Sequence, residues 1–175
     1  EARVMAPLST VANQVSFWRD TGHAADLVMI THRDFLVSLA PLKALRQRQG
    51  FDVEIVALED IYDEFSFGED HPQAIREFLS QISVTWKKAP RFVLLVGDAS
   101  FDARNYLGSG YFDFVPTKLV DTFYLTTASD DWFADFNDDG LAEMSVGRLP
   151  VRTASEAEAL VSKIIQYDST PAKSV

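Results

Sequence analysis

The sequence predicts an α/β fold in which helices cover both faces of a mostly parallel sheet. Three short apolar runs, rich in β-branched residues, alternate with segments of helical periodicity. Such runs are typical of strands that are buried on both faces. A strand–helix–strand–helix–strand order gives parallel strands joined by right-handed crossovers. With 175 residues, 47% of them hydrophobic, the chain is long enough for one sizeable core.

The first half of the chain supplies this alternating pattern. Strands are expected at residues 26–31, 52–58 and 91–97. Leucines at helical spacing after Phe35 predict a helix that ends at Gly50, with Pro41 as an alternative start. Residues 59–70 are acidic and aromatic and are expected to form a connection. Pro72 then marks the first position of a second helix. Its apolar stripe is formed by Ile75, Phe78, Leu79, Ile82 and Trp86.

The pattern changes in the second half. Residues 98–121 are typical of a loop, and residues 122–128 alternate as a strand does. A short strand is expected at residues 144–147, so the acidic segment before it is predicted to join two antiparallel strands at one end of the sheet. An amphipathic helix follows and ends near Tyr167. Two residue pairs fit a capping box at its start: Thr153 with Glu156, and Ser155 with Glu158.

Composition excludes several classes of function. The net charge is −10 and the 16 basic residues are scattered, which argues against a nucleic-acid partner because phosphate binding needs clustered Lys and Arg. The chain has no cysteine, so it contains no disulfide, no thiolate metal site and no cysteine nucleophile. No run of 18 apolar residues is present, so no membrane span is expected. Because the chain starts at Glu1, we expect a fragment or a processed product.

The N-terminal segment, residues 1–25, has no sustained period of either 2 or 3.6 residues. We therefore expect a linker or arm there. Phe17 and Trp18 are its largest apolar side chains and are expected to anchor it by packing on the body of the domain.

An acidic loop is the clearest candidate site in the sequence. Its expected ligands, at relative positions 1, 3, 5, 7 and 9, are Asp135, Asn137, Asp139, Leu141 and Glu143. Leu141 would contribute its backbone carbonyl, and Gly140 allows a tight turn. Many oxygen ligands on a flexible loop favour Ca²⁺ over Mg²⁺.

One other interpretation of this loop stays open. Aspartate is common in solvated turns, so the segment could be a turn without a metal. An EF-hand is excluded, because position 12 is Val146 rather than Glu. Asp130, Asp131 and Asp138 would supply either further ligands or only charge.

No catalytic motif is present elsewhere. Asp98 follows the third strand, at the sheet edge where α/β proteins place their sites, and a capping or hydrogen-bonding role is favoured over a phosphoacceptor. Asp98, Ser100 and Asp102 also mimic part of a metal-dependent adhesion site, on the wrong strand for that fold. The three histidines, His23, His32 and His71, lie in different elements and match no catalytic signature.

Three segments, in their order and spacing, resemble the N-terminal half of the gingipains, cysteine endopeptidases of peptidase family C25. They are residues 92–98 (FVLLVGD), 129–151 (SDDWFADFNDDGLAEMSVGRLPV) and 156–168 (EAEALVSKIIQYD). The GFDVEIVALEDI stretch after the first helix agrees in outline. The resemblance covers about residues 26–168.

The resemblance implies a caspase-like three-layer α/β/α fold with flavodoxin-like strand order, whose second half is missing from this chain. It also implies structural calcium at the acidic loop, secretion by a bacterium or display on its surface, and a polypeptide substrate. In that family a catalytic His and Cys lie in the second half of the domain. No catalytic residue is therefore assigned to this chain.

Two hypotheses follow. In the first, residues 26–168 are the N-terminal subdomain of a secreted cysteine endopeptidase, and residues 169–175 lead to a missing catalytic subdomain. Alone, this chain would be inactive. In the second, the chain is a non-catalytic, calcium-stabilised interaction module on a cell surface.

Overall fold

The computed structural model describes residues 15–170 and has a parallel sheet at its centre. The sheet strands are β1 (Leu27–Thr31), β2 (Val53–Ala57), β3 (Phe92–Val96) and β6 (Ser145–Leu149). They lie in the order β2-β1-β3-β6, and each neighbouring pair is parallel. This order places the first strand inside the sheet, with later strands added on both sides of it, as the family resemblance implies.

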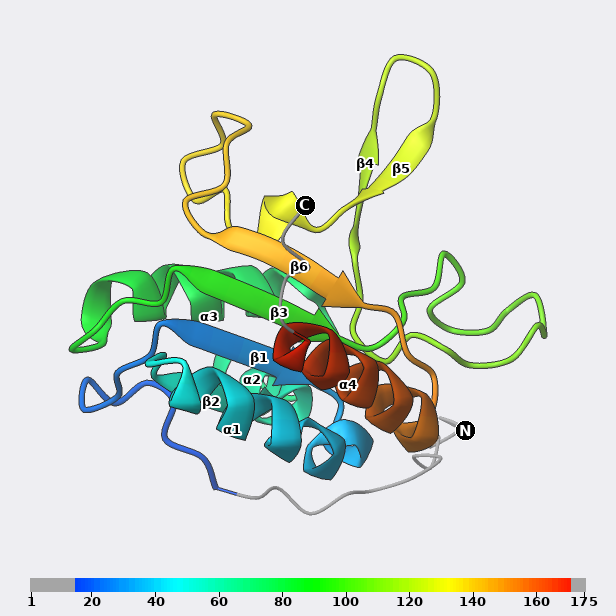
Figure 1. Cartoon of the computed structure of the whole chain (residues 1–175). Coiled ribbons are helices and arrows are strands. Elements are labelled where there is room, and N and C mark those ends of the chain that lie inside the picture. Colours follow the sequence, from blue (N-terminus) through cyan, green and yellow to red (C-terminus); the bar gives the residue numbers. More distant parts are fainter. Residues whose placement is uncertain (1–14, 171–175) are drawn as a thin grey trace.

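Helices cover both faces of the sheet, so the three-layer prediction is confirmed (Figure 1). They are α1 (Ala40–Arg48), α2 (Leu58–Phe65), α3 (Pro72–Thr85) and α4 (Ala154–Ser169). In Figure 1, α1 and α4 lie in front of the sheet and α2 and α3 lie behind it. Each face buries its own apolar cluster, with Phe35 and Leu42 in one and Ile61 and Phe78 in the other.

The helix starts follow their capping residues. Pro72 occupies the first turn of α3, and the His71 side chain accepts a hydrogen bond from the Gln73 amide, which completes the N-cap. Of the two capping boxes considered, α4 uses the first. Thr153 accepts from the Glu156 amide, and the Glu156 carboxylate reaches back to the Arg152 amide. Before α1, two short 3₁₀ turns occupy Arg33–Phe35 and Val37–Leu39.

Helix α2 occupies much of residues 59–70, where the sequence pattern indicates a connection, so this part of the prediction is wrong. Residues Leu58, Ile61, Tyr62 and Phe65 are all buried. Their spacing of three, one and three residues is that of one helix face. The acidic residues that suggested a loop lie off this buried face. Those in the first turn of the helix interact favourably with the helix dipole.

The second half of the chain contains two corrections. The strand predicted at residues 122–128 is a hairpin, in which β4 (Lys118–Asp121) pairs antiparallel with β5 (Thr126–Ser129) around a tight turn. The acidic loop does not join two antiparallel strands. It leads from the 3₁₀ turn at Asp131–Phe133 into β6, which is parallel to β3. Alternation along 122–128 gave the wrong boundary because the pattern runs through a turn.

The amino ends of the sheet strands are tied together at Asp26. Its buried carboxylate lies 2.5 Å from Lys88 Nζ, and it also accepts the Asp52 amide at 2.9 Å. Arg91 Nη2 lies 3.5 Å away on the other oxygen. The Lys88 hydrogen bond is the largest cause of a pKa for Asp26 below its ordinary value. This ionised group therefore holds the starts of three strands in place.

Of the predicted N-terminal arm, residues 1–14 lie outside the described residues. Trp18 packs against the cluster under α2 and α3 as expected. Phe17 does not anchor the chain, since 64% of it is exposed.

Candidate functional site: the acidic loop and the carboxyl edge of the sheet

The acidic loop lies at the amino end of β6, the opposite end of the sheet from the carboxyl ends of the strands. Before the loop, Phe133 and Ala134 are fully buried and fix its first end. After it, the Ser145 amide bonds to the Arg91 carbonyl at the start of β3. The Glu143 amide bonds to the Ala134 carbonyl at 2.8 Å and closes the loop at its base. Fold contacts on both sides therefore fix the ends of the loop.

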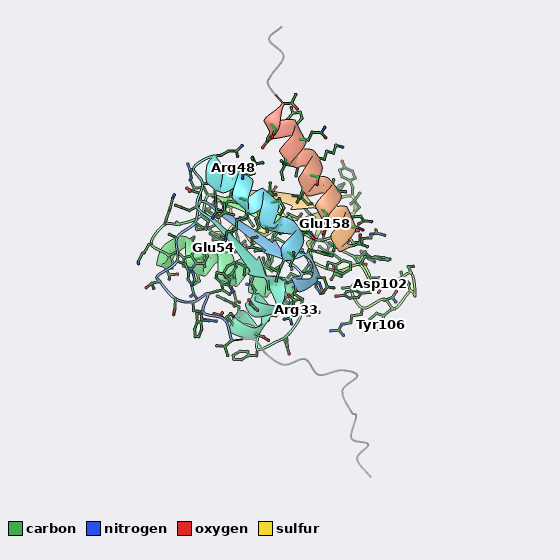
Figure 2. The ribbon with its side chains drawn as sticks, turned by 60° about the horizontal axis from the view of Figure 1, so that its bottom comes forward. Arg33, Arg48, Glu54, Asp102, Tyr106 and Glu158 are labelled. Atoms are coloured by element: carbon green, nitrogen blue, oxygen red, sulfur yellow. The ribbon has the colours of Figure 1, made fainter. Side chains whose placement is uncertain are left out.

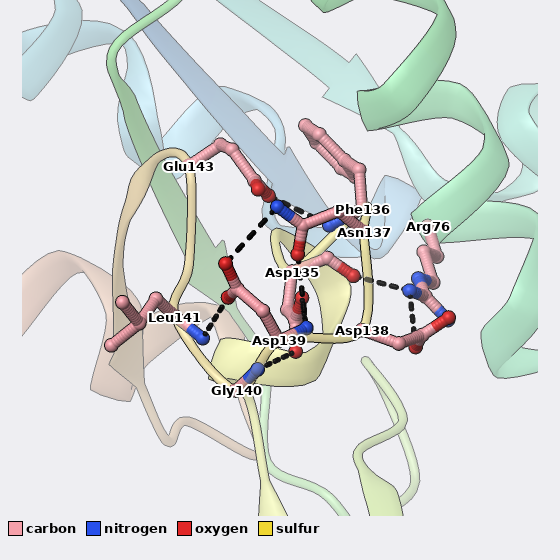
Figure 3. A network of polar contacts seen from close by, with 9 residues as sticks. All are labelled: Arg76, Asp135, Phe136, Asn137, Asp138, Asp139, Gly140, Leu141 and Glu143. Carbon is pink, nitrogen blue, oxygen red and sulfur yellow. Dashed lines mark hydrogen bonds and ion pairs between the residues drawn. The ribbon is translucent and has the colours of Figure 1, made fainter.

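The predicted ligand residues do gather in this loop, where their oxygens accept backbone amides (Figure 3). The Asp135 carboxylate accepts the amides of Asp139 at 3.2 Å and Gly140 at 2.9 Å. Asn137 Oδ1 accepts the Asp139 amide at 2.9 Å, and Asp139 Oδ1 accepts the Leu141 amide at 2.8 Å. The left-handed φ of 85° at Gly140 permits this tight reversal.

Glu143 joins the same network from the far side of the loop. Its Oε2 accepts the Phe136 amide at 2.7 Å. Asp138 does not join the network, because it turns toward Arg76 on α3, whose Nη2 donates to it at 2.7 Å and also contacts the Asp135 carbonyl (Figure 3). In this structure Asp138 therefore forms an ion pair with Arg76 and does not join the set of predicted metal ligands.

The donor set of the loop matches calcium in the type of its atoms. All of its side-chain donors are oxygens of Asp, Asn and Glu, the type that Ca²⁺ prefers, and each ionised carboxylate can accept about four hydrogen bonds or metal contacts. Within residues 15–170, however, no three acidic or histidine side chains are grouped closely enough to hold a metal ion. The residues thus fit calcium by their chemistry, while their carboxylates are held by backbone amides.

At the carboxyl edge of the sheet, Asp98 has a hydrogen-bonding role. Its carboxylate accepts its neighbour Ala99's amide at 3.0 Å and pairs with Arg152 Nε at 2.6 Å. Its backbone bonds to Val151 and Phe114. The group thereby joins the end of β3 to the segment before α4, and nothing in this arrangement indicates a phosphoacceptor.

Arg148 is the most connected side chain at this edge, and the sequence did not reveal it. Its guanidinium makes two bonds to the Asp130 carboxylate, of 2.7 and 2.8 Å. It also donates to the carbonyls of Gly97, Val115 and Pro116 at 2.6–2.9 Å. All of the nitrogens are used, and only 13% of the side chain is exposed. Arg148 therefore ties β6 to the end of β3 and to both roots of the β4–β5 hairpin.

A cavity of about 570 Å³ lies beside the hairpin root. Its lining includes Tyr62, Asp70, Asp113 and Trp132. Withdrawal from water raises the pKa of the Asp113 carboxyl, the Ser100 amide opposes this, and the nearby Asp70 carboxylate raises it further. Withdrawal from water also raises the pKa of the Tyr62 phenol. The cavity is thus a place where acidic groups resist losing their protons.

The remaining candidates have local structural roles. His32 Nδ1 accepts the Asp34 amide and caps the first 3₁₀ turn, while Nε2 lies 3.3 Å from Glu59. Asp102 accepts the amides of Tyr106 and Leu107 within its own loop, which Figure 2 shows at the edge of the molecule. The loop therefore does not form the adhesion-type metal site considered above.

Fold and site together define a domain of the three-layer α/β/α class, with loops gathered at the carboxyl edge of a parallel sheet, in a chain that has no cysteine. The chain belongs to peptidase family C25, whose sequence profile matches residues 20–175. This assignment confirms the resemblance drawn from the sequence.

The solved structures that are similar to this chain include two proteins of greater length. One is the crystal structure of dimeric latent PorU from Porphyromonas gingivalis, with a TM-score of 0.70 and 26% identity over 83% of this chain. The other, described only as a protease, has a TM-score of 0.63 and 19% identity over 85% of this chain, and it supports the fold alone. The chain spans 16% and 29% of the lengths of these two proteins. No curated protein matches it.

Proposed function

We propose that this chain is the N-terminal subdomain of the catalytic domain of a secreted cysteine endopeptidase. The complete enzyme would cleave peptide bonds by thiolate attack, with a polypeptide as its substrate. Membership of family C25 supports the reaction class, and the absence of any cysteine means that the nucleophile must come from another part of the protein. The chain by itself would have no peptidase activity.

The observation that carries this proposal is the outer edge of β6. Within residues 15–170, β6 pairs with β3 on one side and with no strand on the other. An apolar groove of about 340 Å³ lies nearby, lined by residues that include Phe51, Phe92, Leu94 and Val146. An unprotected edge beside an apolar groove favours pairing with a further strand. We infer that the missing catalytic subdomain extends the sheet from this edge.

The experiment is to read the gene beyond Val175 and to produce the longer polypeptide. The expected result is a histidine at a strand end, followed by a cysteine, and cleavage of a denatured protein substrate by the longer chain only. The matched control is the longer chain with its cysteine replaced by alanine, which should be inactive. A gene that ends shortly after Val175 would reject the proposal.

We further propose that the acidic loop binds a structural calcium ion. The residues that would hold it are Asp135, Asn137, Asp139, Glu143 and the carbonyl of Leu141. The all-oxygen donor set supports this choice of ion. The loop's place at the amino edge, away from the carboxyl edge, supports a role in stability rather than in the reaction. Secretion is proposed from the family resemblance; within residues 15–170 no helix has the length and apolar character to cross a membrane.

One observation favours the alternative of a non-catalytic interaction module on a cell surface. The β4–β5 hairpin projects from the body (Figure 1), and its turn carries Phe123 and Tyr124, which are 93% and 88% exposed. Exposed aromatic residues at a projecting turn are typical of a protein–protein contact. The two functions are distinguished by the same gene extension, because only the peptidase needs a cysteine downstream.

A further inference from the structure

Residues 16–23, which we call the docked segment, lie against helices α2 and α3. The family profile begins at residue 20, so the first four residues of the segment precede the family domain. Backbone pairing with the domain begins only at its end, where the Lys87 amide bonds to the His23 carbonyl. Earlier contacts with the helices are made through side chains and helix-end groups.

One carboxylate, that of Glu64 on α2, makes most of the polar contacts to the segment. Its Oε1 accepts Ser16 Oγ at 2.5 Å and the Trp18 amide at 3.0 Å. Its Oε2 accepts the Arg19 amide at 3.1 Å. Hydrogen bonds to an ionised acceptor are stronger than bonds between neutral groups, so this single side chain holds three donors of the segment strongly.

The Arg19 side chain also bonds to the two helices. Its guanidinium donates to the Glu64 carbonyl at 2.6 and 3.2 Å and to Gln81 Oε1 on α3 at 3.3 Å. The same group lies 4.3 Å from the centre of the Phe65 ring. Arg19 therefore spans both helices, satisfying the end of α2 while covering an apolar ring.

A cluster of three aromatic rings completes the contact. The centre of the His23 ring lies 5.1 Å from the ring centres of both Trp18 and Trp86, which are 6.3 Å from each other. Trp18 Nε1 donates to Asp60 at 3.3 Å, and Trp86 Nε1 donates to the Trp18 carbonyl at 3.2 Å. Neither indole N–H is left without an acceptor.

We propose that the α2–α3 face is a docking surface for the chain segment that precedes the family domain, and that Glu64 is its recognition residue. The occupant is residues 16–19 of this same chain, with the pattern Ser-Phe-Trp-Arg, in which Phe17 points to solvent. The segment opens and closes locally while the sheet stays intact, since the hydrogen bonds that residues 16–19 make to the rest of the domain go to α2, to α3 and to Trp86 at the end of α3, and not to the strands. Docking thereby fixes the point at which the chain enters the family domain.

The test is hydrogen exchange followed by mass spectrometry on the full chain. In the parent protein, amides of residues 16–20 should exchange by local opening, faster than those of β1 and β3. Glu64→Ala should speed this exchange by about tenfold or more, the loss expected for a hydrogen bond to a charged group. Glu64→Gln keeps Oε1 but not the second acceptor, so it should give an intermediate change.

Asp63→Ala is the matched control, because this neighbouring carboxylate on the same helix makes no hydrogen bond to the segment. It should leave exchange at residues 16–20 unchanged. Equal exchange rates in the segment and in the strands of the parent protein would overturn the proposal, since the segment would then open only with the whole domain. So would Glu64→Ala without effect. If Glu64→Ala loosens the entire fold, the parent measurement and Ser16→Ala, which removes one bond, still decide the question.

Discussion

Replacing Arg148 by alanine is the perturbation that best tests how the carboxyl edge is held together. The change removes both bonds to the Asp130 carboxylate and the bonds to three backbone carbonyls. The Asp130 carboxylate would keep one hydrogen bond, from Thr117 Oγ1 at 2.9 Å. A partly buried carboxylate and three carbonyls would thus lose a common donor.

The expected loss in the free energy of unfolding follows from these missing bonds. Removing one partner of a fully buried ion pair costs about 3–5 kcal/mol, because the other charge stays buried without compensation. Since 27% of the Asp130 side chain is exposed, the loss for Arg148→Ala should lie near the lower end of this range. For a domain whose total stability is about 5–15 kcal/mol, this is a large share. Arg148→Lys keeps the charge but lacks the planar fork, so it should lose less than alanine and still be weaker than the parent.

The measurement is urea unfolding followed by circular dichroism, with the free energy of unfolding compared between variants. Arg152→Ala is the control, because its side chain is 54% exposed and pairs singly with Asp98. It should cost about 0.2–1 kcal/mol. A double-mutant cycle with Asp130→Ala should show coupling of about 0.5–3 kcal/mol. A loss below about 1 kcal/mol for Arg148→Ala, or no coupling, would refute the reasoning.

Three further predictions concern other parts of the domain. Free calcium at 100 times its Kd should stabilise the protein by about 2.7 kcal/mol and so raise its melting temperature. The double variant Asp135→Ala, Asp139→Ala should lose this response. A melting curve of the parent protein that is the same with calcium and with chelator would reject the site. Because Lys88 lowers the pKa of Asp26 in the folded state, the stability that ionised Asp26 contributes should be complete above about pH 5 and be lost as the pH falls through the folded pKa. Asp26→Asn should flatten that part of the stability–pH curve. An unchanged curve would count against this role of Asp26. Phe78→Ala should cost about 3–5 kcal/mol in urea unfolding, since the ring is fully buried, and a loss under 1 kcal/mol would contradict the packing described.

Much of the fold could be predicted from local patterns. The three apolar runs became β1, β2 and β3, each within one residue of its expected bounds, because a strand buried on both faces leaves a continuous apolar signal. The starts of α3 and α4 were predicted from Pro72 and from the Thr153–Glu156 pair, which act through contacts within one turn. Local chemistry of this kind is visible in one sequence.

Features that depend on distant partners could not be predicted in the same way. The strand after the acidic loop was expected, but its parallel pairing with β3 is decided by residues more than fifty positions away. The loop residues were predicted to lie together and do, yet the turn of Asp138 toward Arg76 depends on α3. Arg148 stood in the sequence as one basic residue among sixteen, and no local signal marks a side chain whose acceptors come from three other segments.

The bonds of Arg148 also restrict how β6 can slide. Side chains of a strand alternate between faces, so a shift of one residue would carry Arg148 from the α2–α3 side to the α4 side and leave all of its acceptors behind. A strand with one neighbour has only half the usual ladder to hold its alignment. Arg148 supplies the missing constraint, and any strand that joins the open edge would therefore meet a template whose alignment is already fixed.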